Sequence, residues 1–241
     1  VYAFKPLLTT FFPAIIKSVF GFKKKLMLDV EDDELYFHYE SKLDFFYNFF
    51  IRGWNNPNSH RNRLILNLFK RLPSITTVVS TKLQKRYGGI IILHGPDENK
   101  FDRDKFNEIR CKNEFSIPKN KIAILFAGIP HPHKGLDIII NGICKKNNFI
   151  LVCAGPKDST MFLQAKKKLG NRVYLLGNIP NDKMPNLLSA TDIVPILQHK
   201  NVFTESQIPA KLIEAMAMSS VIIATPASDI SEILGKHSLT K

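Results

Sequence analysis

The order of apolar and polar positions is most regular in the second half of the chain. Short runs of β-branched and other apolar residues recur there, separated by segments with the spacing of amphipathic helices. Runs that are apolar throughout are typical of strands buried on both faces, and their alternation with helices indicates a parallel sheet. The predicted strands are 122–126, 149–153, 173–176, 192–197 and 221–224. Residues 118–241 are therefore predicted to form most of one doubly wound α/β domain.

The first hundred residues show a related but shorter pattern. Strands are predicted at 1–4, 25–30, 76–79 and 90–93, and helices at 7–20, 42–54 and 61–71. A doubly wound domain normally opens with a strand, a Gly-rich turn and a helix, and no such opening is present. We expect residues 1–97 to be the latter part of a Rossmann-like domain, residues 98–117 to be an interdomain linker and helix, and residues 118–241 to be a second Rossmann-like domain that lacks its C-terminal end.

The composition of the chain shows an excess of positive charge. The 241 residues include 34 Lys and Arg against 21 Asp and Glu, a formal net charge of +13, and 44% of positions are hydrophobic. This composition is that of a folded protein, and the charge favours an anionic partner such as a nucleic acid, a membrane surface or a phosphorylated small molecule. No apolar run approaches the roughly 18 residues of a membrane-spanning helix. The three irregularly spaced cysteines favour reduced thiols in a cytoplasmic protein.

Candidate chemistry follows the first strand of the second domain. In an open parallel sheet, ligands bind beyond the carboxyl ends of the strands. Gly128 would let a ligand approach the backbone, and Lys134 and Gly135 stand where the next helix starts. A lysine beside exposed N–H groups at a helix N-terminus suits a diphosphate, but a proline-rich turn with a solvent-facing lysine fits the segment equally well. His131 and His133 are weak evidence for a metal, because no third ligand is in view.

The next two strand ends carry small residues. Gly155 follows the second strand, and Gly177 and Asn178 follow the third. Small side chains there would leave room for a flat base or a ribose. The same residues also form ordinary turns between a strand and a helix.

The most informative segment spans residues 204–218. Pro209 suits the first position of a helix, and Ala210 and Lys211 would then present N–H groups to an anionic ligand. Glu214 lies three positions after Lys211 on the same helical face, where its carboxylate could accept two hydrogen bonds from a diol such as ribose. A lysine and a glutamate at this spacing also form simple surface pairs, so the diol site remains a hypothesis here.

Taken together, these segments resemble the retaining GT-B glycosyltransferases of group 1, also called family 4. The resemblance covers about residues 75–235 and rests on segments that occur in the family's order. These are the Lys-Gly stretch 128–137, the glycines at 155 and 177, the Ala-Thr-Asp at 190–192, and the stretch 205–217 followed by 221–225 and by Glu232. Upstream, residues 93–97 and Phe101 are similar to the family's interdomain motif.

The resemblance implies roles for single residues. Lys134 would bind the donor diphosphate, Glu214 would hold the ribose hydroxyls, and Glu205 with the backbone after it would face the transferred sugar. Glu205 and Lys134 are thus the implied catalytic residues. The implied donor-binding residues are Gly128, His131, Lys134, Gly135, Gly155, Asn178, Pro209, Ala210, Lys211 and Glu214. His131 stands near the position where the family usually has an arginine, and the two glutamates are nine positions apart where eight is common.

The implied reaction moves a sugar from a nucleotide diphosphate sugar to a glycan or a lipid-linked acceptor with retention of configuration. Neither a metal nor another cofactor is required, so the acidic stretch at residues 31–34, which mimics a metal motif, is expected to be a loop. The helix predicted at 42–54 could lie on an anionic membrane as a peripheral contact at the inner face, or be buried against the sheet.

Three alternatives remain at this stage. A nucleotide-sugar epimerase of the same fold would use the same donor site. A degenerate transferase without activity is compatible with His131. A nucleic-acid-binding protein is suggested only by the net charge, since no basic motif with interleaved aromatic residues occurs; we therefore expect no nucleic-acid partner.

Overall fold

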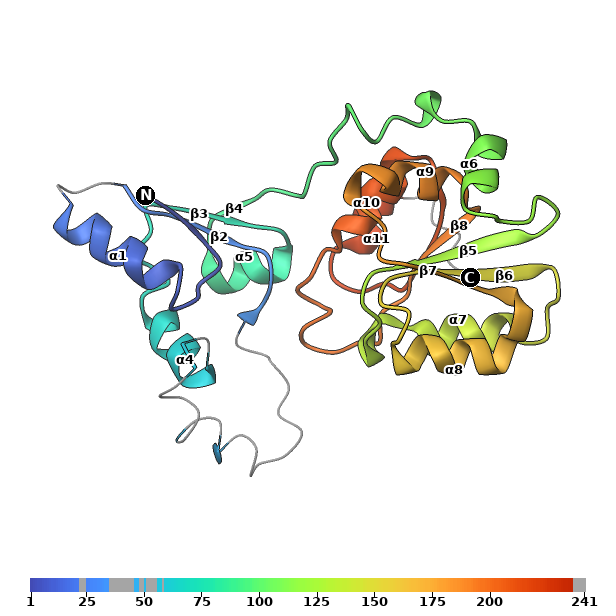
Figure 1. Cartoon of the computed structure of the whole chain (residues 1–241). Helices are drawn as coiled ribbons and strands as arrows, with labels where there is room; N and C mark the ends of the chain where they lie inside the picture. Colours follow the sequence, from blue (N-terminus) through green and yellow to red (C-terminus); the bar gives the residue numbers. More distant parts are fainter. Residues whose placement is uncertain (22–24, 35–45, 48–49, 51–55, 58, 236–241) are drawn as a thin grey trace. The chain divides into compact units, whose positions relative to one another are not determined.

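The computed structural model describes residues 1–21, 25–34, 46–47, 50, 56–57 and 59–235. The chain forms two compact units, each built around one parallel sheet (Figure 1). The first unit contains Val1–Leu93, Asn201–Ile208 and the described residues from Ser231, and the second contains His94–Lys200 and Pro209–Ile230. The short segment Asn201–Ile208 thus belongs to the first unit, although it connects two elements of the second.

The sheet of the first unit has the strand order β1-β2-β3-β4, so strands that follow each other along the chain are also neighbours. Right-handed crossovers that all step in one direction place the connecting helices on one face of the sheet, as Figure 1 shows. The strands are β1 (Tyr2–Phe4), β2 (Met27–Val30), β3 (Ile75–Val78) and β4 (Ile90–Ile91), and the helices are α1 (Phe11–Phe20), α4 (His60–Leu68) and α5 (Thr81–Tyr87).

The predicted strands of this unit are confirmed within two residues at each end. The helix predicted at 7–20 begins only at Phe11 and ends at Phe20, with Gly21 as its C-cap. The helix predicted at 61–71 is α4, whereas α5 was not predicted. The helix predicted at 42–54 lies largely outside the described residues.

The sheet of the second unit has the strand order β7-β6-β5-β8-β9, and all five strands are parallel. Each predicted strand is present with bounds that differ by one residue at most, which confirms the α/β prediction for this half. The strands are β5 (Ile122–Ala127), β6 (Phe149–Ala154), β7 (Val173–Gly177), β8 (Ile193–Ile196) and β9 (Val221–Ala224). The α-helices are α6 (Glu108–Glu114), α7 (Leu136–Ile143), α8 (Thr160–Leu169), α9 (Met184–Ser189) and α10 (Ala210–Ala217), and α11 (Ile230–Leu234) begins at the last residue of this unit.

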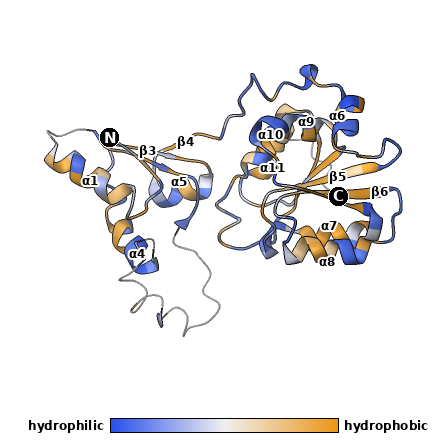
Figure 2. Cartoon of the chain, in the orientation of Figure 1, coloured by the Kyte–Doolittle hydropathy of each residue, from blue (hydrophilic) through white to orange (hydrophobic). Residues whose placement is uncertain are grey.

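The core of the second unit lies between its central strands and the pair α7 and α8. In Figure 2, β5, β6 and the inner side of these helices are hydrophobic. Helix α7 buries Leu136, Ile139, Ile140 and Ile143, the spacing of an amphipathic helix. The ring of Phe126 in β5 meets that of Phe162 in α8 edge-on, with centroids 5.7 Å apart. This packed layer fixes the carboxyl ends of the strands in space.

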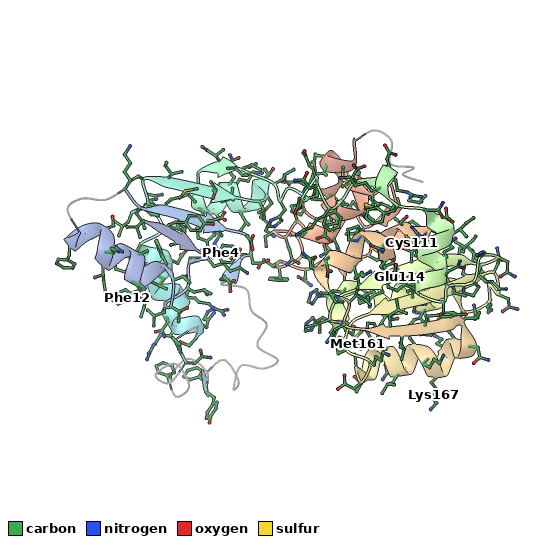
Figure 3. The ribbon with its side chains drawn as sticks, turned by 45° about the horizontal axis from the view of Figure 1, so that its top comes forward. Phe4, Phe12, Cys111, Glu114, Met161 and Lys167 are labelled. Atoms are coloured by element: carbon green, nitrogen blue, oxygen red, sulfur yellow. The ribbon has the colours of Figure 1, made fainter. Side chains whose placement is uncertain are left out.

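Residues 98–117, expected to be an interdomain linker and helix, belong to the second unit, and charged contacts hold them against its other elements. Glu114, at the end of α6, accepts hydrogen bonds from Lys183 and from Asn186 in α9, both at 2.9 Å (Figure 3). The buried ammonium of Lys112 pairs with Asp192 at 3.2 Å, immediately before β8. Helix α6 is therefore tied to the second sheet by contacts that sequence spacing does not reveal.

The acidic stretch at residues 31–34 is the loop after β2, and basic side chains of the same unit bind its carboxylates. Asp32 pairs with Lys5 at 2.5 Å, Asp33 with Arg86 at 2.6 Å, and Glu34 with Arg63 at 3.6 Å. The described part of the chain contains no group of three or more His, Cys, Asp or Glu that could hold a metal. None of its described helices combines the length and the apolar composition needed to cross a bilayer.

Candidate functional site

The second sheet has one topological switch point, between β5 and β8. From β5 the chain builds outward through β6 to β7, and then returns to the other side of β5 with β8 and β9. Ligands of open α/β sheets bind beyond the carboxyl ends of the strands at such a point. Two connections leave the sheet there: the loop after β5, which leads into α7, and the segment after β8, which leads to α10.

Glycines at the strand ends let neighbouring backbone segments lie close together. The N–H of Gly128 donates to the carbonyl of Ala154, and the N–H of Gly155 donates to that of Gly177, both at 2.8 Å. A Cβ on Gly155 would lie 2.5 Å from the carbonyl oxygen of Gly128, so only glycine fits. Gly128 itself has φ +106°, and no atom lies within 4 Å of the place its Cβ would occupy. The structure therefore has open space beside Gly128, and the role of Gly128 in donor binding remains a prediction.

Lys134 ends a short 3-10 turn, Pro132–Lys134, just before α7. Gly135 then adopts a left-handed conformation with φ +64°, and a Cβ there would meet the carbonyl oxygen of Leu197 at 2.4 Å. This contact brings the start of α7 against the chain that leaves β8. The Lys134 ammonium is half-buried and donates to the carbonyl of Ile129 at 2.9 Å, and burial lowers its pKa.

Lys211 lies in the first turn of α10, with its ammonium 5.3 Å from the centroid of the Phe126 ring. Burial, and then the positive charge of Lys134, lower the pKa of Lys211 to about 8. Helix α10 has no side-chain cap and no acidic residue in its first turn. Two lysines and the positive end of a helix therefore meet at the switch point, and an anionic ligand would relieve their repulsion.

Glu214 lies one turn further along α10 and is half-buried. Burial raises its pKa, and within the described part of the chain its carboxylate makes no hydrogen bond or ion pair. A carboxylate removed from water without a partner is unfavourable unless a ligand supplies hydrogen bonds. The predicted diol-binding position thus carries an acceptor that is still available, and the alternative of a Lys211–Glu214 surface pair is not what the structure shows.

The other predicted donor residues lie at the same edge, with one correction. Pro209 is the N-cap of α10, in an extended conformation with ψ 128°, so the first helical residue is Ala210 and not Pro209 as predicted. His131 is exposed and stacks on His133 with ring centroids 5.5 Å apart. Asn178 is exposed directly after β7.

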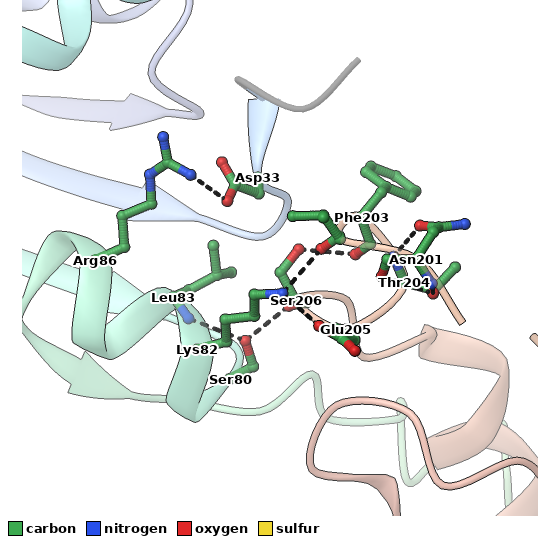
Figure 4. Close-up of polar contacts among 11 residues, drawn as sticks. Asp33, Ser80, Lys82, Leu83, Arg86, Asn201, Phe203, Thr204, Glu205 and Ser206 are labelled. Carbon is green, nitrogen blue, oxygen red and sulfur yellow. Dashed lines mark hydrogen bonds and ion pairs between the residues drawn. The ribbon is translucent and has the colours of Figure 1, made fainter. Parts of the chain in front are cut away.

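The structure does not bring Glu205 into the same unit as these residues. Glu205 lies in Asn201–Ile208, within the first unit, where its Oε2 accepts a hydrogen bond from the ammonium of Lys82 at 2.8 Å (Figure 4). Lys134, Lys211 and Glu214 form one cluster in the second unit, and Glu205 belongs to another set of contacts. The catalytic roles of Glu205 and Lys134 remain predictions.

Sequence reasoning missed a second set of residues at the switch point. The His199 ring binds the carboxylate of Asp137 in the first turn of α7, with 2.9 Å between Nε2 and Oδ1. The backbone N–H of His199 donates to the carbonyl of His133, also at 2.9 Å. This pair ties the loop that carries Lys134 to the chain after β8. Lys157 was also missed. Its side chain lies against Gly177, since a Cβ on Gly177 would be 2.9 Å from the Lys157 Cε. No spacing along the sequence signals partners that are 62 positions apart.

Solved structures show which class of protein this fold belongs to. Anabaena Alr3699/HepE, solved in complex with UDP and glucose, has a TM-score of 0.71 at 18% identity, with 98% of this chain and 62% of that chain covered. WaaG, a glycosyltransferase involved in lipopolysaccharide biosynthesis, has a TM-score of 0.62 at 15% identity, with 93% and 65% covered. The two parallel α/β sheets thus define a protein of the GT-B fold class.

The family follows from the sequence itself. The family model described as "Glycosyl transferases group 1" matches residues 107–240, more than half of the chain, so this protein belongs to the group 1 glycosyl transferases. A curated relative is the phosphatidylinositol N-acetylglucosaminyltransferase GPI3 subunit of Saccharomyces cerevisiae (strain ATCC 204508 / S288c), 29% identical over 124 residues, which are 48% of this chain and 26% of that protein. The chain therefore spans about a quarter of the length of the curated relatives it matches.

Proposed function

We propose that this protein transfers a sugar from a nucleotide diphosphate sugar to a glycan or a lipid-linked acceptor, with retention of configuration at the anomeric carbon. The observation that carries the proposal is the pair of half-buried lysines, Lys134 and Lys211, at the switch point of the second sheet. Membership of the group 1 family supports a sugar-transfer reaction.

The lysine pair favours a diphosphate over a neutral ligand. Each ammonium is partly removed from water, and neither has a carboxylate partner in the described part of the chain. Anionic phosphate oxygens would replace the lost water and satisfy the uncapped N–H groups of Ala210 and Lys211. HepE was solved with UDP and glucose bound, which makes UDP the first ligand to test.

Each residue of the cluster then has a chemical role. Lys134, Lys211 and the N-terminus of α10 would stabilise the negative charge that develops on the departing diphosphate. Glu214 would accept hydrogen bonds from the ribose hydroxyls, and Gly128 would leave space for the donor beside the backbone. In this proposal the leaving group is neutralised by protein cations, so neither a metal nor another cofactor is needed.

A lipid-linked acceptor and a peripheral membrane contact are the remaining parts of the proposal. The GPI3 subunit belongs to a phosphatidylinositol N-acetylglucosaminyltransferase, and phosphatidylinositol is a lipid. In the first unit, α1 exposes Phe12, Ile16, Val19 and Phe20, with exposed fractions of 46%, 43%, 63% and 82% (Phe12 is labelled in Figure 3). These positions share one helical face, which is the pattern of a helix that lies on a bilayer surface.

The test begins with binding. We expect the chain to bind UDP in calorimetry and to release UDP from a UDP-sugar, slowly with water and faster with a suitable acceptor. GDP- and ADP-sugars test the choice of base. Glu214→Ala should weaken UDP binding at least tenfold and reduce release in parallel, while Lys167→Met, an exposed change on α8, should alter neither.

Two further results distinguish a retaining transferase from an epimerase. The anomeric configuration of the product, read by NMR, tests retention. If a nucleotide sugar is instead recovered as its epimer in a reaction without acceptor, the protein is an epimerase. If no nucleotide or nucleotide sugar binds and the Glu214→Ala variant matches the wild type, the transferase proposal is wrong.

A further inference from the structure

The segment Asn201–Ile208 has a defined conformation of its own. The N–H of Thr204 donates to the side-chain oxygen of Asn201 at 2.9 Å, and the hydroxyl of Ser206 donates to the carbonyl of Phe203 at 2.8 Å (Figure 4). Thr204 and Ser206 are completely buried. The turns of the segment are therefore closed from within, and the Glu205 side chain leaves a fixed stretch of backbone.

The first turn of α5 holds this segment. Ser80, the N-cap of α5, is buried, and its hydroxyl donates to the carbonyl of Ser206 at 2.7 Å. Two positions later, the ammonium of Lys82 donates both to Glu205 Oε2 at 2.8 Å and to the carbonyl of Val202 at 3.3 Å. One cation thus binds the carboxylate and the backbone of the same turn.

The far end of the segment is held by the loop after β2. Gln207 donates to Asp32 Oδ1 at 2.9 Å, and the other oxygen of Asp32 pairs with Lys5. Contacts from two elements of the first unit therefore flank Glu205, although the segment leads directly into α10, whose first turn carries Lys211.

We propose that Lys82 is a positioning residue, which fixes the orientation of the Glu205 carboxylate within the first unit. The inference rests on the proposed function and on the role that the family resemblance implies for Glu205, which is to face the transferred sugar. The side chains of Lys82 and Glu205 are 37% and 34% exposed, so their pair contributes little to stability in water. Its effect is on geometry, because a cation that binds both the carboxylate and the backbone of its turn restricts the carboxylate to fewer orientations.

The proposal assigns separate roles to residues of the two units. Lys134, Lys211 and Glu214 bind the nucleotide part of the donor, and they belong to a different unit from Lys82 and Glu205. Lys82 lies in the unit expected to receive the acceptor. The loss of Lys82 should therefore affect the sugar-dependent step and leave nucleotide binding unchanged.

The experiment compares Lys82→Met, Lys82→Arg, Glu205→Gln and the double variant Lys82→Met/Glu205→Gln with the wild-type chain. Lys85→Met is the matched control, because Lys85 is exposed on the same helix. We expect Lys82→Met and Glu205→Gln each to lower kcat at least tenfold while the Kd for UDP stays within twofold. Lys82→Arg should keep most of the activity, and the double variant should be no slower than Glu205→Gln alone.

Hydrogen exchange gives a readout independent of turnover. Peptides covering 201–208 should exchange faster in Lys82→Met than in Lys85→Met, and peptides from α7 and α8 should not change. Full turnover in Lys82→Met beside an inactive Glu205→Gln would overturn the inference, as would loss of UDP binding in Lys82→Met, which indicates a general structural role. If the wild type uses no nucleotide sugar at all, the proposed function fails and the inference fails with it; an active wild type with an equally active Lys82→Met contradicts the inference alone.

Discussion

Lys211 lies half-buried beside Lys134, and burial together with the positive charge of Lys134 lowers the pKa of Lys211 to about 8. The two cations occur on connections that leave the sheet on either side of its switch point. In the unliganded protein this arrangement is unfavourable, and an anion bound between the helix N-terminus and the ammonium groups would make it favourable. Such an arrangement lowers the free energy of unfolding of the unliganded protein and favours ligand binding.

Lys211→Met should therefore stabilise the unliganded protein at pH 7 and strongly weaken UDP binding. The folded-state pKa lies below the ordinary lysine value of 10.5, so the charged form is disfavoured by folding, and the full penalty applies below about pH 8. We expect a gain of roughly 1 to 3 kcal/mol in the free energy of unfolding at pH 7. Urea denaturation measures it, with Lys167→Met as the control.

The gain should shrink as the pH rises from about 8 toward 10.5, because the folded wild type then releases the proton and escapes the penalty. A gain that is constant across this range would show that the penalty does not come from the charge on Lys211.

The affinity for UDP should fall as the pH rises above about 8. In the proposed site the diphosphate binds to the Lys211 ammonium, and the free protein loses that proton with a pKa of about 8. The decline should approach about tenfold per pH unit while the free protein is deprotonated and the complex is not. Calorimetry from pH 7 to 9.5 measures it, and Lys211→Met should bind weakly with a flat profile over the same range.

Glu214→Gln should remove discrimination between UDP and its 2′-deoxy analogue. Hydrogen bonds to a charged acceptor contribute on the order of 1.5 to 3 kcal/mol, or about 10- to 100-fold in affinity. The wild type should prefer UDP by about that factor, because the half-buried carboxylate has no other partner in the described residues. Comparable preference in both proteins would remove Glu214 from the ribose site.

Two glycines, one at the start of α7 and one inside it, should respond to alanine in opposite directions. At Gly135, φ is +64° and the new Cβ would lie 2.4 Å from the Leu197 carbonyl oxygen, so strain alone should cost roughly 1 to 3 kcal/mol. At Gly142, inside the helix, nothing lies within 4 Å of a new Cβ, and alanine should add about 0.5 to 1 kcal/mol of stability. Thermal unfolding of both variants checks the pair, and destabilisation by Gly142→Ala would contradict it.

Much of the local structure could be predicted from the chain. The central strands β5 and β6 appear as apolar runs because both of their faces are buried, and Gly128, Gly155 and Gly177 mark the ends of β5, β6 and β7. Helix α5 was missed because its seven residues bury only Leu83 and Tyr87, too few for a periodic signal. Ser80 caps α5, but a serine alone does not predict a helix unless an amphipathic pattern follows it.

By itself the sequence determined the strands, the α/β class and the family, since these depend on which residues seek burial and on short segments in a fixed order. Only the tertiary structure decided which side chains share a site. The meeting of Lys134 with Lys211 depends on β8 returning beside β5, and the contact of Lys82 with Glu205 joins positions 123 apart. Such pairs are fixed by strand order and by crossovers between distant segments, so no local pattern along the chain encodes them.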